Sequence, residues 1–358
     1  MRVGLIAPPW APVPPVGYGG TEVVVDNLAR GLQVLGHDVR LFTVGDSTCP
    51  VPTSSLYGTA PRPIGTTVEE AAHVLAAYEA MAEVDLIHDH TVLGPLLAPW
   101  PRHGIPPVVS THHGAFTDEN RRIVREVARR AAVIAISHDQ ASRAPEIPIA
   151  SVIHHGIDLA TYRPGPGDGG YLLFLGRMSR EKGIAAALRV AHRTGRRLKV
   201  VTKMRDPSET DYFTTVVEPM LADDDELLLE PTIETRLDLL QHAEALINPI
   251  AWPEPFGLAM AEALASGTPV IGYGAGAAPE IVDHGSTGLL CHDEDDLSRA
   301  VGRIRFLDRG ACRAAAERRF SLARMAHDHV ELYERVLSNP ASAHELHLGV
   351  RPQAEVVA

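Results

Sequence analysis

The sequence is poor in cysteine, which limits the chemistry that it can carry. Its 358 residues include three cysteines, Cys49, Cys291 and Cys312, and no two of them have the spacing of a metal-binding or redox pair. An odd number of isolated cysteines is typical of proteins from a reducing compartment, where disulfides do not persist. Cysteine therefore indicates neither a metal site nor a redox centre.

Long apolar runs are also missing. No stretch approaches the ~18 residues that a membrane-spanning helix needs. The apolar start of the chain is interrupted by Pro8 and Pro9, too early for the apolar core of a signal peptide. We therefore expect a cytoplasmic protein without an integral membrane segment.

Positive charge is scarce, and lysine above all. The net charge of −12 is the wrong sign for binding nucleic acid by bulk electrostatics, so no nucleic-acid partner is expected. Only Lys182, Lys199 and Lys203 are lysines; the other basic residues are arginines. Against that background a lysine is a mild hint that its ammonium group matters, although an accidental lysine is an equally good explanation.

What the chain does contain is two halves of alternating strands and helices. A length of 358 residues and 45% hydrophobic residues fit two globular α/β domains. In the first half, a strand at 3–7 leads into a Pro/Gly loop that ends in Gly19 and Gly20, and Thr21 is expected to cap the following helix. The loop lacks GxGxxG, so a dinucleotide fingerprint is not supported. A loop that approaches a phosphate and a plain turn both remain open.

Polar residues follow three further strands, predicted at 84–88, 107–110 and 132–136. The chain continues into Asp89 and His90 after the first, into Thr111 to Gly114 after the second, and into Ser137 and His138 after the third. Parallel strands end at one edge of a sheet, and ligands bind there in doubly wound folds. These tips are expected to form one wall of a cleft.

The segment 162–170 has the composition most typical of a linker in this chain, because it is rich in Gly and Pro. We place the boundary there, with an N-terminal domain at 1–163 and a C-terminal domain at 164–321. The second half repeats the strand–helix pattern, with strands at 171–175, 198–202, 227–229 and 245–248. A last helix is expected at 322–336, and 338–358 is expected to be a mobile tail.

The segment Trp252 to Ile271 predicts a short loop, a helix from Leu258 to Ala265 and a buried strand. Two carboxylates, Glu254 and Glu262, flank the junction between loop and helix, where a core has no need of acids. The N–H groups of Phe256, Gly257 and Leu258 would point away from the helix and could hold an anion. An anion site beside carboxylates fits a ligand with both phosphate and hydroxyl groups, such as a nucleotide sugar.

Two motifs carry a resemblance to a known family. Glu254 and Glu262 form E-x7-E, and Gly176-Arg177 with Glu181-Lys182-Gly183 matches G-R-x3-E-K-G. Together with the Gly19-Gly20 loop and the Thr-x-His-Gly of 111–114, the chain resembles the retaining GT-B glycosyltransferases of family GT4 over about residues 1–338. The resemblance implies two Rossmann-like doubly wound domains facing across a cleft. It also implies that a last helix, at about 322–337, crosses back to the N-terminal domain.

The resemblance also implies roles for individual residues. Arg177 and Lys182 would bind the donor diphosphate, which agrees with the need to neutralise a departing dianion. Glu254 would contact the transferred sugar, Glu262 the ribose, and His113 would lie near the anomeric centre; with Arg177 and Lys182, Glu254 and His113 form the expected catalytic set. Further donor contacts are expected from Gly19, Gly20, Phe256, Gly257 and Leu258, and from Thr232 and Ile233 near the base.

Three features stay outside this pattern. The family usually has a glycine where this chain has Thr202-Lys203, which leaves the role of Lys203 open between contact with a phosphate or acceptor and plain solvation. His88-Asp89-His90 and His154-His155 invite a metal site, but no third ligand has motif spacing. We expect no metal and no cofactor, and interpret His88 and His90 as cleft-wall or acceptor contacts.

These observations predict an enzyme that moves a sugar from a nucleotide-diphosphate sugar to a small-molecule, glycan or lipid-linked acceptor, without a metal and with retention of anomeric configuration. A GT-B nucleotide-sugar epimerase and a nucleotide-sugar-binding module without transfer activity remain alternatives. A sugar phosphorylase would want a cofactor lysine motif, and none is visible. The sequence does not indicate the sugar, the base, the acceptor, the linkage or the oligomeric state.

Overall fold

The N-terminal half is a parallel sheet covered by helices. The computed structural model describes residues 1–17, 19–65, 67–98 and 106–338. Its first sheet has the order β3-β2-β1-β4-β5-β6-β7. The strands are β1 (Arg2–Ile6), β2 (Asp38–Thr43), β3 (Thr53–Ser55), β4 (Leu86–Asp89), β5 (Val108–His112), β6 (Ala132–Ala135) and β7 (Ile149–Val152). The helices of this half are α1 (Gly20–Val34), α2 (Thr67–Ala80), α3 (Gly94–Leu97), α4 (Asp118–Val127) and α5 (His138–Ser142).

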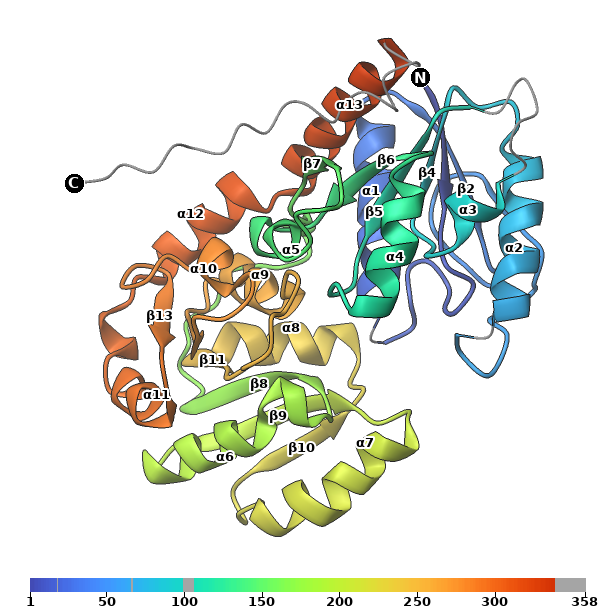
Figure 1. Ribbon diagram of the computed structural model, residues 1–358. Helices are drawn as coiled ribbons and strands as arrows, with labels where there is room; N and C mark the ends of the chain where they lie inside the picture. Colours follow the sequence, from blue (N-terminus) through green and yellow to red (C-terminus); the bar gives the residue numbers. More distant parts are fainter. Residues whose placement is uncertain (18, 66, 99–105, 339–358) are drawn as a thin grey trace.

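The second half repeats this architecture with a six-stranded parallel sheet of order β10-β9-β8-β11-β12-β13 (Figure 1). Its strands are β8 (Tyr171–Arg177), β9 (Arg197–Lys203), β10 (Glu226–Leu229), β11 (Ala245–Asn248), β12 (Val270–Tyr273) and β13 (Gly288–Cys291). Its helices are α6 (Ile184–Arg193), α7 (Pro207–Tyr212), α8 (Ile233–His242), α9 (Leu258–Ala265), α10 (Ala278–Ile281), α11 (Glu294–Val301) and α12 (Arg309–Arg319). Two doubly wound sheets were predicted, and the structure confirms both.

Strands of both sheets are apolar runs because helices cover both of their faces. All four residues of β6 are buried, as are the first six of β8. One local prediction was wrong: Thr21 does not cap the first helix. Helix α1 begins at Gly20, its N-cap is Gly19, and no side chain caps it.

The last helix, α13 (Leu322–Ser338), leaves the C-terminal half and packs on α1 of the other half (Figure 1). Met325 and Tyr333 of α13 belong to the same hydrophobic cluster as Val3 and Leu28. The boundaries at 163/164 and 321/322 stay predictions. Of the predicted tail at 338–358, residues 339–358 lie outside the described part. Among the described helices, none is both long and apolar enough to cross a membrane.

Candidate active site

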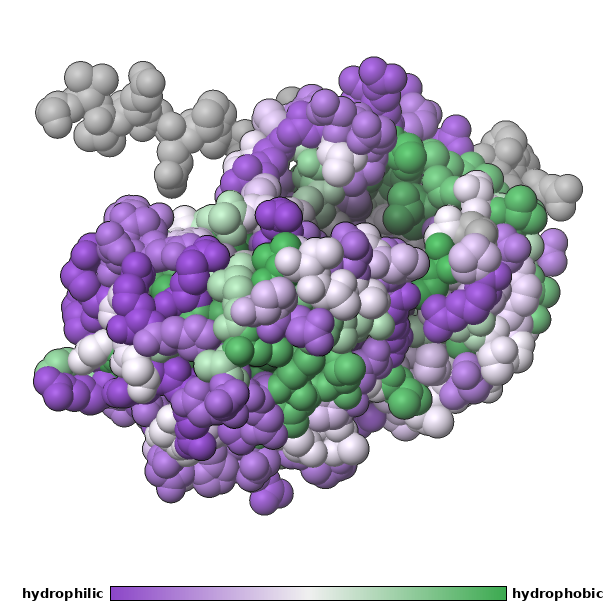
Figure 2. Space-filling model, turned by 90° about the horizontal axis from the view of Figure 1, so that it is seen from below, coloured by the Kyte–Doolittle hydropathy of each residue, from purple (hydrophilic) through white to green (hydrophobic). Residues whose placement is uncertain are grey.

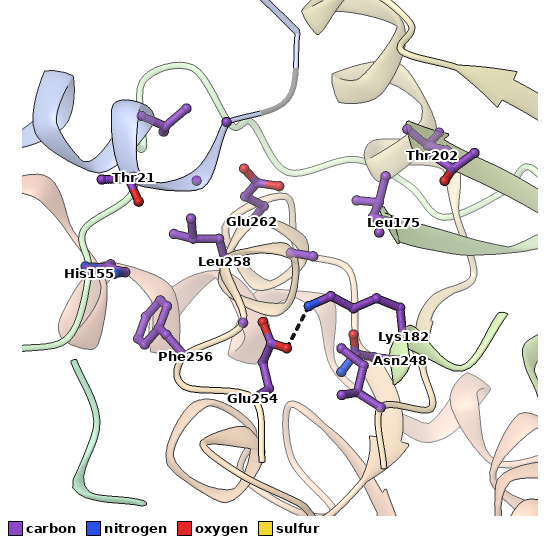
Figure 3. A pocket seen from close by; sticks show the side chains of 18 of the residues that line it. Thr21, His155, Leu175, Lys182, Thr202, Asn248, Glu254, Phe256, Leu258 and Glu262 are labelled. Carbon is purple, nitrogen blue, oxygen red and sulfur yellow. Dashed lines mark hydrogen bonds and ion pairs between the residues drawn. The ribbon is translucent and has the colours of Figure 1, made fainter. Parts of the chain in front are cut away.

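A cleft opens where the carboxyl ends of strands from both sheets meet, as expected for doubly wound folds. It encloses about 1220 Å³, including its open mouth, which is ample room for a nucleotide sugar. One wall comes from the N-terminal half, through Gly17, Gly19, Gly20 and His113. The other wall is made by β8, the segment 230–231, the end of β11 and residues 254–262 (Figure 3).

Lys182 and Glu254 form an ion pair in this cleft, with Nζ and Oε2 2.6 Å apart (Figure 3). Lys182 closes a short 3-10 turn (Arg180–Lys182) that follows β8, and Gly183 then takes a left-handed φ of 80° to start α6. The Lys182 ammonium also lies 5.5 Å from the centre of the Trp252 ring. Both predicted residues therefore lie together, and a bound phosphate would compete with Glu254 for the ammonium group.

The N-terminus of α9 opens into the same cleft. Gly257 is its N-cap, with a φ of 96° that side-chain-bearing residues rarely adopt, and a Cβ atom there would lie 2.4 Å from Met260 Cε. Phe256, Gly257 and Leu258 all line the cleft. Among the described residues, no acceptor bonds the N–H groups of these three. Free N–H groups at a helix start form an anion site.

Glu262 lies one helical turn further into α9 and is buried. Its Oε1 accepts a hydrogen bond from the Tyr162 hydroxyl at 2.7 Å and pairs with the Arg236 guanidinium at 3.3 Å. Tyr162 comes from the linker between the sheets and Arg236 from α8. These two donors orient the carboxylate and leave Oε2 for a ligand hydroxyl.

Three other predicted donor contacts do not line the cleft. Arg177 pairs with Glu181 at 3.1 Å and with Glu209 at 3.5 Å, and its side chain is 42% exposed. Thr232 caps α8 by accepting from the N–H of Thr235, and Ile233 begins that helix. The segment before them, Glu230 and Pro231, reaches the cleft instead. Contacts of Arg177, Thr232 and Ile233 with a donor remain predictions.

Gly20 does lie where a donor loop was expected. It begins α1 on the N-terminal wall, and a Cβ built on it would lie 3.6 Å from Leu258 Cδ1 of the opposite wall. Gly19 precedes it and also lines the cleft. The two walls are therefore close at this point, and a ligand between them would touch both.

His113 lines the cleft, and its Nε2 lies 2.9 Å from Nδ1 of His90. Burial lowers the pKa of His113 to about 3, so the ring is neutral at pH 7. His88 and His90 were interpreted as cleft-wall or acceptor contacts. The cleft-wall interpretation is wrong, because they are buried at 0% and 4% exposure behind His113 and are not among the lining residues; a contact with an acceptor stays a prediction. The sheet brings them there because β4 and β5 are neighbours.

Several lining residues were not predicted from the sequence. They include Leu175, Val201, Thr202, Asn248, Arg236 and His155. Asn248 is the last residue of β11, so the rule that ligands bind at strand ends could have identified it. Glu230 is the one non-glycine residue of the described chain with a positive φ, 43°, and its carboxylate pairs with Arg205. No sequence signal marks that conformation.

The histidine-rich segments do not form a metal site in the described residues, where no group of three or more His, Cys, Asp or Glu side chains is arranged to hold a metal ion. His154 donates instead to Glu280 of the C-terminal half, with Nε2 and Oε2 2.8 Å apart. The same carboxylate accepts from the N–H groups of His138 and Asp139 at the start of α5. This part of the sequence therefore links the two halves.

Comparison with known proteins agrees with this geometry. A family model described as Glycosyltransferase Family 4 matches residues 18–161, and one described as Glycosyl transferases group 1 matches residues 169–305. D-inositol 3-phosphate glycosyltransferase 2 of Catenulispora acidiphila is 29% identical, with 85% of this chain and 86% of that protein covered. Glycogen synthase of Mycobacterium tuberculosis is 27% identical, with 90% and 89% covered.

Solved structures share the fold. AviGT4, a glycosyltransferase of avilamycin A biosynthesis, has a TM-score of 0.72 at 29% identity, covering 94% of this chain and 98% of its own. Sucrose-phosphate synthase of Thermosynechococcus elongatus has a TM-score of 0.79 at 22% identity, covering 94% and 99%. With two parallel sheets, a cleft between them and both family models in order along the sequence, the chain belongs to glycosyltransferase family 4 and has the GT-B fold.

Proposed function

We propose that this glycosyltransferase moves a sugar from a nucleotide-diphosphate sugar to an acceptor, with retention of anomeric configuration and without a metal ion. The Lys182–Glu254 pair at the start of α9 carries the proposal. At this point of the cleft, a cation, a carboxylate and the free N–H groups at the start of α9 lie together. A relative named GDP-mannose:cellobiosyl-diphosphopolyprenol alpha-mannosyltransferase and a fold neighbour solved with UDP and glucose support a nucleotide-sugar donor.

Each group has a task in this reaction. Lys182 and the N–H groups of α9 would stabilise the diphosphate as it leaves, where negative charge develops. Arg177 would add a second cation if its side chain left Glu181 and Glu209. Glu254, released by Lys182, would accept a hydrogen bond from a sugar hydroxyl, and Glu262 one from the ribose.

The engagement of the carboxylates in the cleft argues against a double displacement. A double displacement needs a free carboxylate to attack the anomeric carbon. Among the described lining residues, the carboxylates are Glu230, Glu254 and Glu262; Glu230 and Glu262 are paired with arginines, and Glu254, once released by Lys182, would be engaged by a sugar hydroxyl. We therefore favour attack of the acceptor on the face from which the diphosphate leaves.

The acceptor would enter from the N-terminal half. Seen from below, hydrophobic side chains are frequent in the centre and on the right of the molecule, whereas the left is mainly hydrophilic (Figure 2). Exposed large hydrophobic residues of the N-terminal half include Val16, Leu56, Ile64, Val68 and Val92. Val16 follows β1, Leu56 follows β3 and Val92 follows β4, so these lie beyond strand ends. An acceptor with an apolar part would suit this surface.

A donor panel tests the proposal. The purified protein is incubated with UDP-, GDP- and ADP-sugars, with and without acceptors of each class, and the released nucleotide is measured in the presence and absence of EDTA. We expect acceptor-dependent release from one donor, unaffected by EDTA, with the product keeping the donor's anomeric configuration by NMR. Binding without turnover would favour a binding module, and an altered sugar without an acceptor would favour an epimerase.

Lys182→Met is expected to lower kcat/KM by about 10²-fold or more, because one cation facing the leaving group is lost. Lys199→Met is the matched control: Lys199 pairs with Glu226, outside the lining of the cleft. Initial rates and melting temperatures of both variants are compared. Full activity of a folded Lys182→Met protein would contradict the role given to Lys182.

A further inference from the structure

Five histidines lie in contact at the cleft wall and behind it, a concentration that donor binding does not explain. We call them the histidine cluster: His88, His90, His113, His155 and His329. The ring centres of His88 and His90 are 4.0 Å apart, those of His90 and His113 5.2 Å, and those of His113 and His155 5.3 Å. His113 and His155 line the cleft, and the other three lie deeper.

One hydrogen bond of the cluster defines where a proton lies. His90 Nδ1 and His113 Nε2 are 2.9 Å apart, so one of these two nitrogens carries the hydrogen. Burial lowers the pKa of both rings, so each is neutral and carries a single N–H. Two arrangements are possible: the shared proton lies on His90 or on His113.

The other nitrogen of His90 decides between them. His90 Nε2 is buried and has no hydrogen-bond partner among the described residues. If the shared proton were on His113, His90 would carry its own proton on Nε2, as an N–H buried without an acceptor. With the proton on Nδ1, Nε2 keeps only a lone pair. Buried N–H groups without an acceptor are rarer than unsatisfied acceptors, so His90 donates from Nδ1.

His113 then accepts at Nε2, and its own proton must be on Nδ1. Within the described part of the chain, no partner bonds His113 Nδ1, and its side chain lines the cleft. The proton is thus available to a ligand oxygen. In an imidazole without such a partner, the proton would be free to occupy Nε2 instead, so this arrangement depends on the bond from His90.

His90 is itself held by packing. The ring of His88 lies against it, and both nitrogens of His88 are bonded: Nδ1 to the Tyr333 hydroxyl of α13 and Nε2 to the Thr111 hydroxyl of β5, each at 2.7 Å. A ring fixed at two points restricts how far His90 can rotate. The hydrogen bond between His90 and His113 is therefore supported by residues of β4, β5 and α13.

We propose that His90 is a positioning residue that holds His113 as the Nδ1–H tautomer, so that His113 donates a hydrogen bond to an oxygen of the donor sugar and does not act as a general base. The acceptor's proton must then leave by another route, such as the departing diphosphate oxygen. The role in transfer rests on the proposed function, whereas the tautomer itself does not.

Nitrogen NMR of the wild-type protein tests the tautomer directly. Long-range ¹H–¹⁵N correlation spectra of ¹⁵N-histidine-labelled protein distinguish the two tautomers, and the His113→Gln variant assigns the signals. We expect the Nδ1–H pattern for His113 and for His90 at pH 7. An Nε2–H pattern for His113 would overturn the proposal, whether or not the protein transfers sugars.

Two substitutions of similar size test the consequence. The amide nitrogen of His90→Asn can replace Nδ1 as a donor, whereas His90→Leu removes the donor. We expect His90→Leu to lower kcat about 10- to 100-fold with little change in the donor KM, and to shift His113 towards Nε2–H. His90→Asn should stay within about threefold of wild type. Equal losses in two variants with wild-type melting temperatures would overturn the positioning role.

Discussion

At the scale of single residues, the position of Glu262 depends on Tyr162, a linker residue with no place in any motif. The Tyr162 hydroxyl donates a hydrogen bond of 2.7 Å to the Glu262 carboxylate, and this contact is shorter than the one from Arg236. Tyr162 is buried, so removing its hydroxyl leaves Glu262 with one donor fewer in a low-dielectric site.

Tyr162→Phe is therefore expected to weaken nucleotide binding about three- to tenfold, because Glu262 is less firmly oriented towards the ribose. Calorimetric titration with the preferred nucleoside diphosphate measures this. Tyr57→Phe serves as the control, since Tyr57 bonds the carbonyl of Glu69, outside the cleft lining. Equal affinity of wild type and Tyr162→Phe would show that nucleotide binding does not depend on the orientation of Glu262 by Tyr162.

The sequence led to the expectation that Lys182 and Glu254 lie in one cleft, because each belongs to a motif that follows a strand of the same sheet, and the structure places both there; their roles in binding a donor stay predictions. The sequence was less informative for Arg177, which belongs to the same motif as Lys182. Its side chain turns to Glu209, a residue of α7 far along the sequence, and such a partner is chosen by the fold. Arg236 and His155 reach the cleft for the same reason, through packing that no local pattern records.

At the scale of elements, α9 depends on a glycine at each end. Gly257 has a φ of 96° and Gly267 one of 71°. Alanine at either position would cost about 1–2 kcal/mol of unfolding free energy, because both lie in the left-handed region. Only Gly257 lines the cleft.

We expect Gly257→Ala and Gly267→Ala to lower the melting temperature by similar amounts. Gly257→Ala alone is expected to weaken nucleoside-diphosphate binding, by about tenfold, because it shifts the N–H groups of α9. Thermal unfolding and calorimetric titration of both variants check this. Similar affinity losses in the two variants would indicate a general effect on the helix rather than an anion site.

Most elements were predictable because apolar runs bounded by glycine and proline mark buried parallel strands. The helix Leu258–Ala265 was predicted with its observed bounds. The start of α1 was not, because a helix that begins with Gly19 and Gly20 has no side-chain cap to recognise. Strand β3 was missed as well: it is short, polar and exposed, so it has no apolar signal.

At the scale of the whole molecule, the histidine cluster makes stability depend on pH. Burial lowers the pKa of His88, His90 and His155 well below its usual value, and that of His329 to about 4. The unfolded chain binds these protons from about pH 6.5 downwards, whereas the folded protein does not. Their stabilising contribution is therefore complete above that pH and is lost as the pH falls towards 4.

His329 is expected to remove roughly 2 kcal/mol of unfolding free energy between pH 7 and pH 5, and the other three rings act in the same direction. Asp89 acts in the opposite direction: burial raises its pKa to about 6, which offsets roughly 1 kcal/mol over the same range. Urea unfolding at the two pH values measures the sum. His329→Asn should reduce the pH dependence and His327→Asn should not, because His327 is exposed. Unchanged stability at pH 5 would contradict this.

The return of α13 has a consequence for how the protein is made. The core of the first half is completed by Met325, Tyr333 and Val336, which a ribosome adds only after the residues of the second half. The half that emerges first is therefore finished last, after the whole second half has appeared. Until then α1 lacks the helix that covers Gly31, and its apolar surface stays open to chaperones and to other nascent chains.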